Sequence, residues 1–325
     1  MQIAVVALCT FVLALVFGRL LIPALRALKA GQSIREIGPS WHNSKAGTPT
    51  MGGIMFIAAA ILCVVAAGWR SMLAGYRTHL YVLAFALVFG LIGFIDDFVK
   101  VKFKRNLGLT ALQKLVLQLA AAGAYLALLR WNGDLTCDLY IPFWNVSFEI
   151  NWIVYLVFAM FVIVGCVNAV NLTDGIDGLA SGVTLPVMVF FAVTAWTWGK
   201  TTLALLPAAL AGGLAGFLVY NFHPAKVFMG DTGSLFLGGM VCGLAFALDM
   251  PLVLILVGII YIMETVSVIM QVTYFKLTHG KRIFRMTPIH HHFEMGGWSE
   301  EKIFTVFVGI TVLMCILAFI GVSGR

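Results

Sequence analysis

The sequence predicts an all-α, polytopic membrane protein with about ten transmembrane helices and both termini on the outer side of the membrane. Of its 325 residues, 61% are hydrophobic and only 11% are charged, which is far from the composition of soluble globular proteins. The mean hydropathy is +1.00. Long apolar segments recur along the chain, and each approaches the roughly 20 residues that a spanning helix needs. We therefore expect one integral-membrane domain over residues 1–325 and no soluble domain.

From the N-terminus onward, the apolar segments define the expected helices in order. They lie at residues 2–22, 51–68, 79–95, 111–129, 152–170, 179–198, 202–220, 235–248, 251–275 and 303–322. The first has no Lys or Arg before Arg19 and no small-residue cleavage site, so we expect a retained helix rather than a signal peptide. Residues 130–151 alternate in polarity, which predicts a short β-hairpin at the membrane interface. Its expected aromatic anchors are Trp131, Trp144 and Trp152.

Lysine and arginine residues are distributed unequally between the two sides of the predicted bundle. If the loops after the first, third, fifth, seventh and ninth helices are cytoplasmic, these loops and their flanks hold sixteen of the 21 basic residues. The sixteen are Arg19, Arg26, Lys29, Arg35, Lys45, Lys100, Lys102, Lys104, Arg105, Lys114, Lys226, Lys276, Lys281, Arg282, Arg285 and Lys302. The positive-inside rule then places both termini outside. Such a basic face attracts anionic lipid headgroups and anionic substrates, although topology alone accounts for part of the excess.

The polar motifs of the chain all fall on this predicted cytoplasmic face. They are KAGTPTMGG at 45–53, DDFVK at 96–100, NAVNLTDGIDG at 168–178, NFHP at 221–224, GDTGS at 230–234 and PIHHHFE at 288–294. Each has an ordinary structural explanation by itself, such as a helix cap, a solvated charge pair or an Asx-turn. Their convergence on one side favours a functional site, because ionisable residues at a membrane boundary are costly.

Phosphoryl transfer is the chemistry that this set of residues best supports. Such reactions neutralise phosphate charge with Mg²⁺ held through carboxylates, together with cations and backbone N–H groups. The candidate metal ligands are Asp174, Asp177, Asp231 and Asp96 or Asp97, while Lys45, Lys100, Lys114 and the histidines could hold anionic oxygens. A zinc hydrolase is disfavoured, because three consecutive histidines point in different directions and lack a helical His-x-x-x-His partner.

Glu264 lies inside the apolar segment 251–275, with Gln271 on nearly the same helix face. A carboxylate that faces lipid is expensive, so we expect it to face other helices or a cavity. A structural hydrogen bond is favoured over a catalytic role. The length and the polar groups of this segment also suggest that it bends to frame a groove for a lipid substrate.

Together these motifs resemble the phospho-N-acetylmuramoyl-pentapeptide-transferase family, within the polyprenyl-phosphate N-acetylhexosamine-1-phosphate transferase superfamily. The similarity covers nearly the whole chain. It runs through KAGTPTMGG at 45–53, GFIDDFVK at 93–100, GLTALQK at 108–114, NAVNLTDGIDGLA at 168–180, NFHPAKVFMGDTGS at 221–234 and PIHHHFE at 288–294. The last motif separates this branch from relatives that use UDP-GlcNAc.

The resemblance implies a Mg²⁺-dependent transfer of phospho-MurNAc-pentapeptide from its UDP carrier to undecaprenyl phosphate, which yields lipid I and UMP. This is the first membrane step of peptidoglycan synthesis. It implies a protein of the bacterial cytoplasmic (inner) membrane with its active site on the cytoplasmic face. The expected partners are UDP-MurNAc-pentapeptide, undecaprenyl phosphate, the lipid bilayer and a second copy in a homodimer, with no nucleic acid.

The resemblance also implies roles for individual residues. The catalytic residues are Asp96, Asp97 and Asp231, and the metal ligands are Asp231, Asp174 and Asp177. The substrate-binding residues are Lys45, Lys100, Lys114, Asn168, Asn171, Asp174, Asp177, Asn221, Ser234, Gln271, His290, His291 and His292. Two mechanisms stay open. Either an aspartate, with Asp97 preferred, attacks the sugar-linked phosphate to form a phospho-enzyme, or it deprotonates undecaprenyl phosphate, which attacks directly.

Two other functions remain as alternatives. A sibling transferase that uses UDP-GlcNAc shares the aspartates, but the motif at 288–294 argues against it. A secondary transporter would place its ionisable residues near the membrane midplane and often show inverted repeats. Here the polar clusters lie at helix ends and no repeat is visible, so transport is disfavoured.

Overall fold

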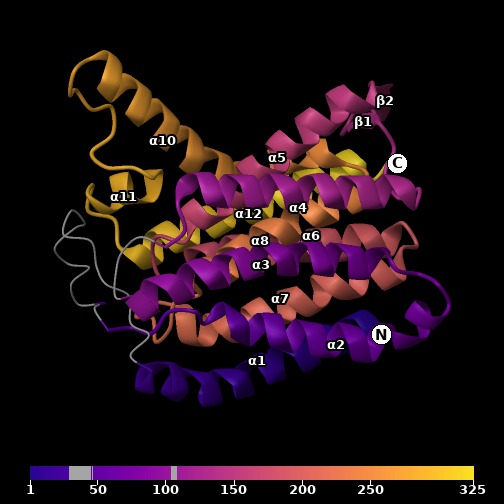
Figure 1. The fold of residues 1–325 in the computed structure, drawn as a ribbon, viewed down its shortest axis with the longest axis horizontal. Coiled ribbons are helices and arrows are strands. Elements are labelled where there is room, and N and C mark those ends of the chain that lie inside the picture. The colour runs from indigo at the N-terminus through magenta and orange to yellow at the C-terminus, as the bar shows by residue number, and fades with distance from the viewer. Residues whose placement is uncertain (29–44, 46, 104–107) are drawn as a thin grey trace.

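The computed structural model describes residues 1–28, 45, 47–103 and 108–325 of the chain. Four residues of the charge prediction, Lys29, Arg35, Lys104 and Arg105, lie outside this part. Long helices lie side by side in one bundle, roughly along the horizontal axis of Figure 1. This arrangement confirms the all-α, polytopic prediction.

Within the described residues, nine helices are long and apolar enough to span a membrane. They are α1 (Gln2–Ala27), α2 (Gly53–Leu73), α3 (Thr78–Phe103), α4 (Ala111–Trp131), α5 (Trp152–Thr173), α6 (Leu179–Thr197), α7 (Thr201–Asn221), α8 (Gly230–Ala247) and α12 (Glu300–Val322). Helix α8 begins at Gly230, whereas the sequence predicted this span from residue 235. The run GDTGS is therefore the first turn of a spanning helix rather than a preceding loop.

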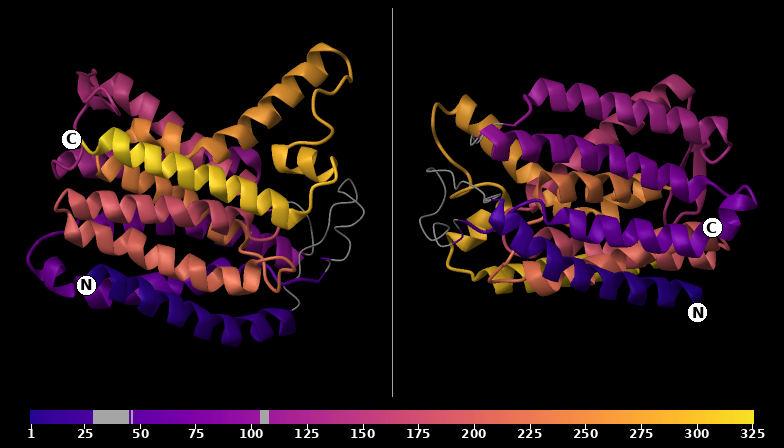
Figure 2. Two further views of the ribbon diagram at one scale, coloured as in Figure 1. Left: turned by 180° about the vertical axis from the view of Figure 1, so that it is seen from behind. Right: turned by 60° about the horizontal axis from the view of Figure 1, so that its bottom comes forward.

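The remaining predicted span, residues 251–275, is broken into two helices. A 3₁₀ turn, η2 (Pro251–Val253), and the short helix α9 (Leu254–Val257) precede α10 (Ile259–Leu277), with a bend of 82°. Gly258 lies at the break, where an added Cβ would come within 2.5 Å of the Leu254 carbonyl oxygen. Helix α10 leans away from the rest of the bundle (Figure 2, left). The expected bend is confirmed.

The predicted hairpin is present and consists of β1 (Asp138–Ile141) and β2 (Val146–Glu149), paired antiparallel. Its turn docks on the end of α12, where the Phe143 N–H donates to the Gly321 carbonyl oxygen at 2.8 Å. Trp144 is 76% exposed, as a membrane-interface anchor should be. The hairpin and both chain termini lie at one end of the bundle, opposite the short helix α11 (Ile289–Glu294) (Figure 1).

Helix α8 is the central helix of the bundle, and nearly all of its side chains are buried. Its small residues let neighbouring backbones approach closely, as is usual for helices packed in a membrane. A Cβ on Gly238 would come within 2.6 Å of Val167 Cα on α5, and one on Gly239 within 3.0 Å of Ala86 Cα on α3. Close packing therefore holds the N-terminus of α8 beside the ends of α3 and α5, which carry the polar motifs.

Candidate active site

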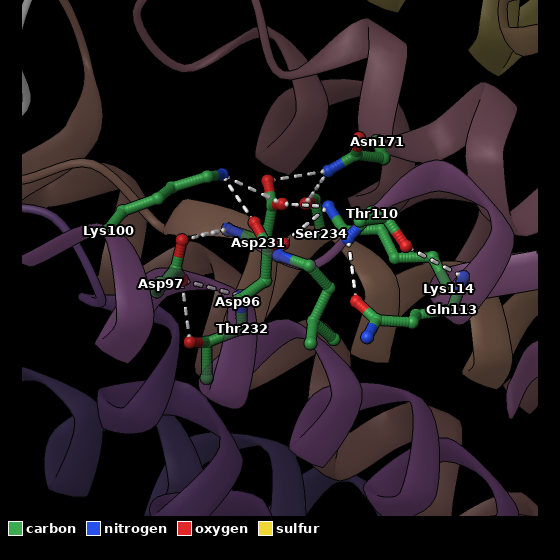
Figure 3. A network of polar contacts seen from close by, with 11 residues as sticks. Asp96, Asp97, Lys100, Thr110, Gln113, Lys114, Asn171, Asp231, Thr232 and Ser234 are labelled. Carbon is green, nitrogen blue, oxygen red and sulfur yellow. Dashed lines mark hydrogen bonds and ion pairs between the residues drawn. The ribbon is translucent and has the colours of Figure 1, made fainter. Parts of the chain in front are cut away.

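Four helices bring polar side chains together in one network (Figure 3). The group consists of Asp231 from the first turn of α8, Lys114 from the start of α4, Asn171 from the end of α5, and Asp96, Asp97 and Lys100 from the end of α3. We call the three aspartates and two lysines the Asp231 cluster. The structure thus unites residues that were predicted from four separate sequence motifs.

Asp231 is the most exposed carboxylate of this cluster, with 18% of its side chain exposed. Its Oδ2 accepts hydrogen bonds from Lys100 Nζ at 3.1 Å and from Lys114 Nζ at 2.9 Å. Its Oδ1 accepts from Asn171 Nδ2 at 3.0 Å, and the same amide donates to Ser234 Oγ at 2.8 Å. Asp231 therefore presents a lysine-flanked carboxylate at a helix N-terminus, where anionic groups are electrostatically favoured.

Asp96 is buried and contacts the same two lysines. Lys100 Nζ lies 2.6 Å from its Oδ2, and Lys114 Nζ lies 3.1 Å from its Oδ1. The Leu109 N–H also donates to Oδ1 at 2.6 Å. Because each lysine bridges Asp96 and Asp231, both ammonium groups are fixed in position beside the exposed carboxylate.

The position of Lys114 follows from the way α4 begins. Thr110 is the N-cap, and its Oγ1 accepts from the Gln113 N–H at 3.3 Å. The Gln113 side chain accepts from the Thr110 N–H at 2.9 Å, which completes a capping box (Figure 3). Lys114 is the next residue, so this cap fixes the start of the helix that carries it toward Asp231.

Asp97 is almost fully buried and caps the N-terminus of α8. Its Oδ1 accepts from the Asp231 N–H at 3.2 Å, and its Oδ2 accepts from the Thr232 N–H at 2.9 Å and the Thr232 hydroxyl at 2.7 Å. Gly230 has a φ of +71°, and an added Cβ there would come within 2.6 Å of Asp97 Oδ2. Asp97 therefore holds the turn that presents Asp231.

The donor set of the Asp231 cluster fits a hard divalent cation. Ligand oxygens of Asp96, Asp97 and Asp231 all lie within 4.8 Å of one another. Sets of carboxylate oxygens suit Mg²⁺, which usually binds through one or two carboxylates and keeps several waters. Asp96 and Asp97 are almost fully buried, whereas Asp231 is partly exposed, so Asp231 is the best-placed direct ligand of the three.

The other two residues predicted as metal ligands, Asp174 and Asp177, are placed differently. Asp174 is the C-cap of α5 and is partly buried. Burial, together with the charges of Asp231, Asp97 and Asp177, raises the pKa of Asp174 to about 8. Asp177 is buried and belongs to a second group of charged side chains, which is described next. Among the described residues, neither belongs to the close carboxylate set around Asp231.

The second group, which we call the Lys45 cluster, consists of Lys45, Asp177, His223 and Glu300. Lys45 Nζ lies 2.8 Å from Asp177 Oδ1 and 2.7 Å from the Glu300 carboxylate. Asp177 Oδ2 lies 2.9 Å from His223 Nδ1. Asp177, His223 and Glu300 are also close enough to share a metal ion. However, an imidazole donor suits Mg²⁺ less than oxygen does, and the Lys45 ammonium already neutralises one of the two carboxylates.

Sequence reasoning did not select two members of the Lys45 cluster as site residues. His223 belongs to the motif NFHP, so its neighbourhood was recognised without its role. Glu300 begins α12 and lies 123 residues from Asp177, whose N–H donates to Glu300 Oε2 at 3.0 Å. An acidic residue in the first turn of a helix is an ordinary helix-dipole feature, so nothing in the sequence pointed to this contact.

Several of the predicted substrate-binding side chains are engaged in internal contacts. Asn168 Nδ2 donates to Gln118 Oε1 at 2.8 Å. Asn221 is 2% exposed, and it joins α7 to the following loop through the Val227 carbonyl oxygen at 3.0 Å. Gln271 Oε1 accepts from the N–H groups of residues 283 and 284, both at 3.0 Å. These contacts show how the three side chains hold helices and loops around the site.

The three histidines of α11 contact different partners, as the sequence predicted. His290 Nδ1 lies 3.0 Å from Glu264 Oε2, His291 Nδ1 lies 2.8 Å from Glu294 Oε2, and His292 Nδ1 accepts from the Arg285 N–H at 3.1 Å. Glu264 is fully buried, so it faces protein rather than lipid, in agreement with its predicted structural hydrogen bond. Within the described residues, the histidines are not grouped as metal ligands.

Comparisons with known proteins show which family the chain is similar to. Residues 79–249 match glycosyl transferase family 4, and residues 45–57 match the phospho-N-acetylmuramoyl-pentapeptide-transferase signature 1. The phospho-N-acetylmuramoyl-pentapeptide-transferase of Clostridium beijerinckii is 48% identical over 96% of this chain and 94% of its own length. The protein of the same name from Caldanaerobacter subterraneus is 47% identical over 99% of both chains.

The fold, the lysine-braced carboxylates and these comparisons define an integral-membrane phosphoglycosyl transferase. Within that class, the chain belongs to the phospho-N-acetylmuramoyl-pentapeptide-transferase family, because its relatives match it at almost half of all positions over nearly its whole length.

Proposed function

We propose that the protein transfers phospho-MurNAc-pentapeptide from UDP-MurNAc-pentapeptide to undecaprenyl phosphate, with Mg²⁺, giving lipid I and UMP. The observation that carries this proposal is the Asp231 cluster, in which one partly exposed carboxylate lies between two lysines at the N-terminus of a central helix. Such a site provides both a place for a divalent cation and fixed positive charge for phosphate oxygens. The names of the closely similar relatives support the choice of sugar donor.

Asp231 is the residue that we propose as the direct Mg²⁺ ligand, with Asp96 and Asp97 close by. The metal would supply charge neutralisation on the phosphate oxygens. Lys100 and Lys114 would hold the anionic oxygens of the two substrates, because their ammonium groups are fixed between Asp96 and Asp231.

The contacts of Asp97 favour direct attack by the lipid phosphate over a phospho-enzyme. Both oxygens of Asp97 accept bonds from the first turn of α8, so a phosphoryl group on either oxygen would disrupt the cap. The acceptor phosphate is already largely anionic at neutral pH and needs little help from a base. Asp97 would then act by positioning Asp231 and the helix N-terminus.

We also propose that the protein resides in the bacterial cytoplasmic membrane with its site facing the cytoplasm. The support is that the Asp231 cluster lies at the end of the bundle where α3 ends and α4 begins, the end that the positive-inside rule assigns to the cytoplasm. The bent helix α10 leans away from the bundle (Figure 2), and we propose that the lipid substrate approaches beside it. The homodimer rests on the family resemblance alone.

Purified protein in detergent tests this proposal directly. UMP release would be followed with undecaprenyl phosphate and either UDP-MurNAc-pentapeptide or UDP-GlcNAc, with Mg²⁺ and with EDTA. The proposal predicts metal-dependent release with the muramyl donor alone. Release with UDP-GlcNAc instead would move the protein to the sibling branch, and no release from folded protein with either donor would contradict a transferase.

A further inference from the structure

A buried carboxylate–imidazole pair joins α10 to α11 outside both clusters described above. Glu264 Oε2 lies 3.0 Å from His290 Nδ1, and both side chains are 0% exposed. The His290 N–H also points to Glu264 Oε2 at 3.5 Å. Desolvation offsets much of the attraction in a pair buried this completely, so the pair adds little net stability by itself.

The other ring nitrogen of His290, Nε2, faces the backbone at Gly175. His290 Nε2 is buried and has no hydrogen-bond partner among the described residues. An added Cβ on Gly175 would come within 2.2 Å of this nitrogen and 2.5 Å of Cε1. The φ of Gly175 is not positive, so the ring itself, rather than the backbone conformation, requires glycine at this position. The imidazole therefore packs directly on the turn that follows α5.

This turn connects the two clusters of the site. Just before it, Asn171 donates to Asp231 Oδ1, and the Asp174 N–H closes the end of α5 on the Asn171 carbonyl oxygen at 3.2 Å. Just after it, Asp177 contacts Lys45 and Glu300. A shift of the turn would therefore move Asn171 and Asp177, while Lys100 and Lys114 stay held by Asp96 on α3.

Gln271 provides an internal comparison on the same helix. It contacts the segment before α11 through the backbone of residues 283 and 284. Glu264 and Gln271 thus attach the segment 281–294 to α10, but only Glu264 acts on the ring that touches Gly175.

We propose that Glu264 and His290 form a positioning pair, in which the carboxylate fixes the imidazole and the imidazole holds the turn at Gly175, so that residues 171–177 face the nucleotide-sugar donor. The inference rests on the proposed function, since it assigns these residues to the donor side of that reaction. The pair acts through the turn and touches no reacting atom.

Substitutions from opposite sides of the contact test this inference. Glu264→Gln weakens the hold on the ring, whereas Gly175→Ala pushes the ring away, and the two changes share no chemical group. His290→Asn retains a donor near Glu264 but cannot reach Gly175. Gly165→Ala, also near the end of α5, is the matched control, because no atom lies within 4 Å of its added Cβ. All are measured as full-length protein in detergent.

The proposal predicts that Glu264→Gln, Gly175→Ala and His290→Asn each raise the donor KM by about tenfold or more. The KM for undecaprenyl phosphate should stay close to that of Gly165→Ala. In the His290→Asn background, Gly175→Ala should cost nothing further, since the clash is gone. If one variant is too unstable to purify, the donor KM values of the other two decide.

The inference is overturned if these variants bind donor like the wild type, if the acceptor KM rises instead, or if the Gly175→Ala and His290→Asn effects simply add. The donor KM of each variant is compared with that of the wild type, using whichever UDP-sugar donor the wild type accepts. A wild type that uses UDP-GlcNAc would therefore refute the proposed substrate without deciding the positioning role.

Discussion

Asp97 and Thr232 are joined by two hydrogen bonds to one oxygen, since Asp97 Oδ2 accepts from the Thr232 N–H at 2.9 Å and from its hydroxyl at 2.7 Å. The carboxylate on α3 thereby closes the N-terminus of α8. Asp231 precedes Thr232, and its own N–H donates to Asp97 Oδ1 at 3.2 Å, while its side chain contacts the lysines. The cap and the proposed metal ligand are thus two parts of one local structure.

This relationship predicts that Asp97 contributes to stability as well as to activity. Asp97→Ala leaves buried donors of α8 unpaired and should lower the free energy of unfolding by about 1–3 kcal/mol. Thr232→Val removes only the hydroxyl bond and should cost less. Thermal unfolding in detergent measures both. An unchanged melting temperature for Asp97→Ala, together with lost activity, would instead assign Asp97 to the chemistry.

Lys45 and Glu300 should be energetically coupled, because Lys45 Nζ lies 2.7 Å from the Glu300 carboxylate and both are largely buried. In a double-mutant cycle with Lys45→Met and Glu300→Gln, we expect a coupling free energy of about 0.5–3 kcal/mol. The cycle is measured by denaturant or thermal unfolding, with the exposed neighbour Glu301→Gln as the control for Glu300. Strict additivity would show that the Lys45 cluster does not act as a unit.

The raised pKa of Asp174 predicts a pH dependence of stability. Its pKa is about 8 in the folded protein against an ordinary value of 3.8, so the folded state binds an extra proton between these values. The resulting stabilisation is fully present below the ordinary pKa and is lost as the pH rises through the folded-state value. With divalent cations chelated, the unfolding free energy of the wild type should therefore fall more steeply toward pH 8 than that of Asp174→Asn. Parallel curves would contradict this.

The topology can be checked by cysteine labelling. Ser147 on the hairpin and Lys281 beyond α10 are both exposed. In spheroplasts, an impermeant maleimide should label Ser147→Cys and reach Lys281→Cys only after permeabilisation. The wild type corrects for labelling of native cysteines. The reverse pattern would place the site outside.

Most of the fold could be predicted because each spanning helix has its own apolar segment, and the length of that segment can be read locally from the sequence. The start of α8 was missed for a physical reason. GDTGS has the composition of a loop, and it is helical here because Asp97 caps it from another helix. The break at Gly258 was expected only as a bend, since one glycine in an apolar segment does not reveal an angle of 82°.

The site shows the same division between local and long-range information. The sequence predicted the aspartates and lysines by type, but their grouping depends on contacts between distant segments. Asp177 lies with Glu300, and their separation of 123 residues in the sequence leaves no local signal for this contact. His290, expected in the substrate cleft, is fully buried against Glu264 and the turn at Gly175.

The central claim is that Asp231 is the direct Mg²⁺ ligand, and it is tested most directly by UMP release as a function of Mg²⁺ concentration. The measurement compares the wild type with Asp231→Asn, and Asp138→Asn at the opposite end of the bundle is the control. The account predicts that Asp231→Asn loses about 100-fold or more in turnover, keeps its melting temperature and shows no saturation with Mg²⁺, while Asp138→Asn behaves like the wild type. Wild-type Mg²⁺ dependence and turnover in Asp231→Asn would contradict it.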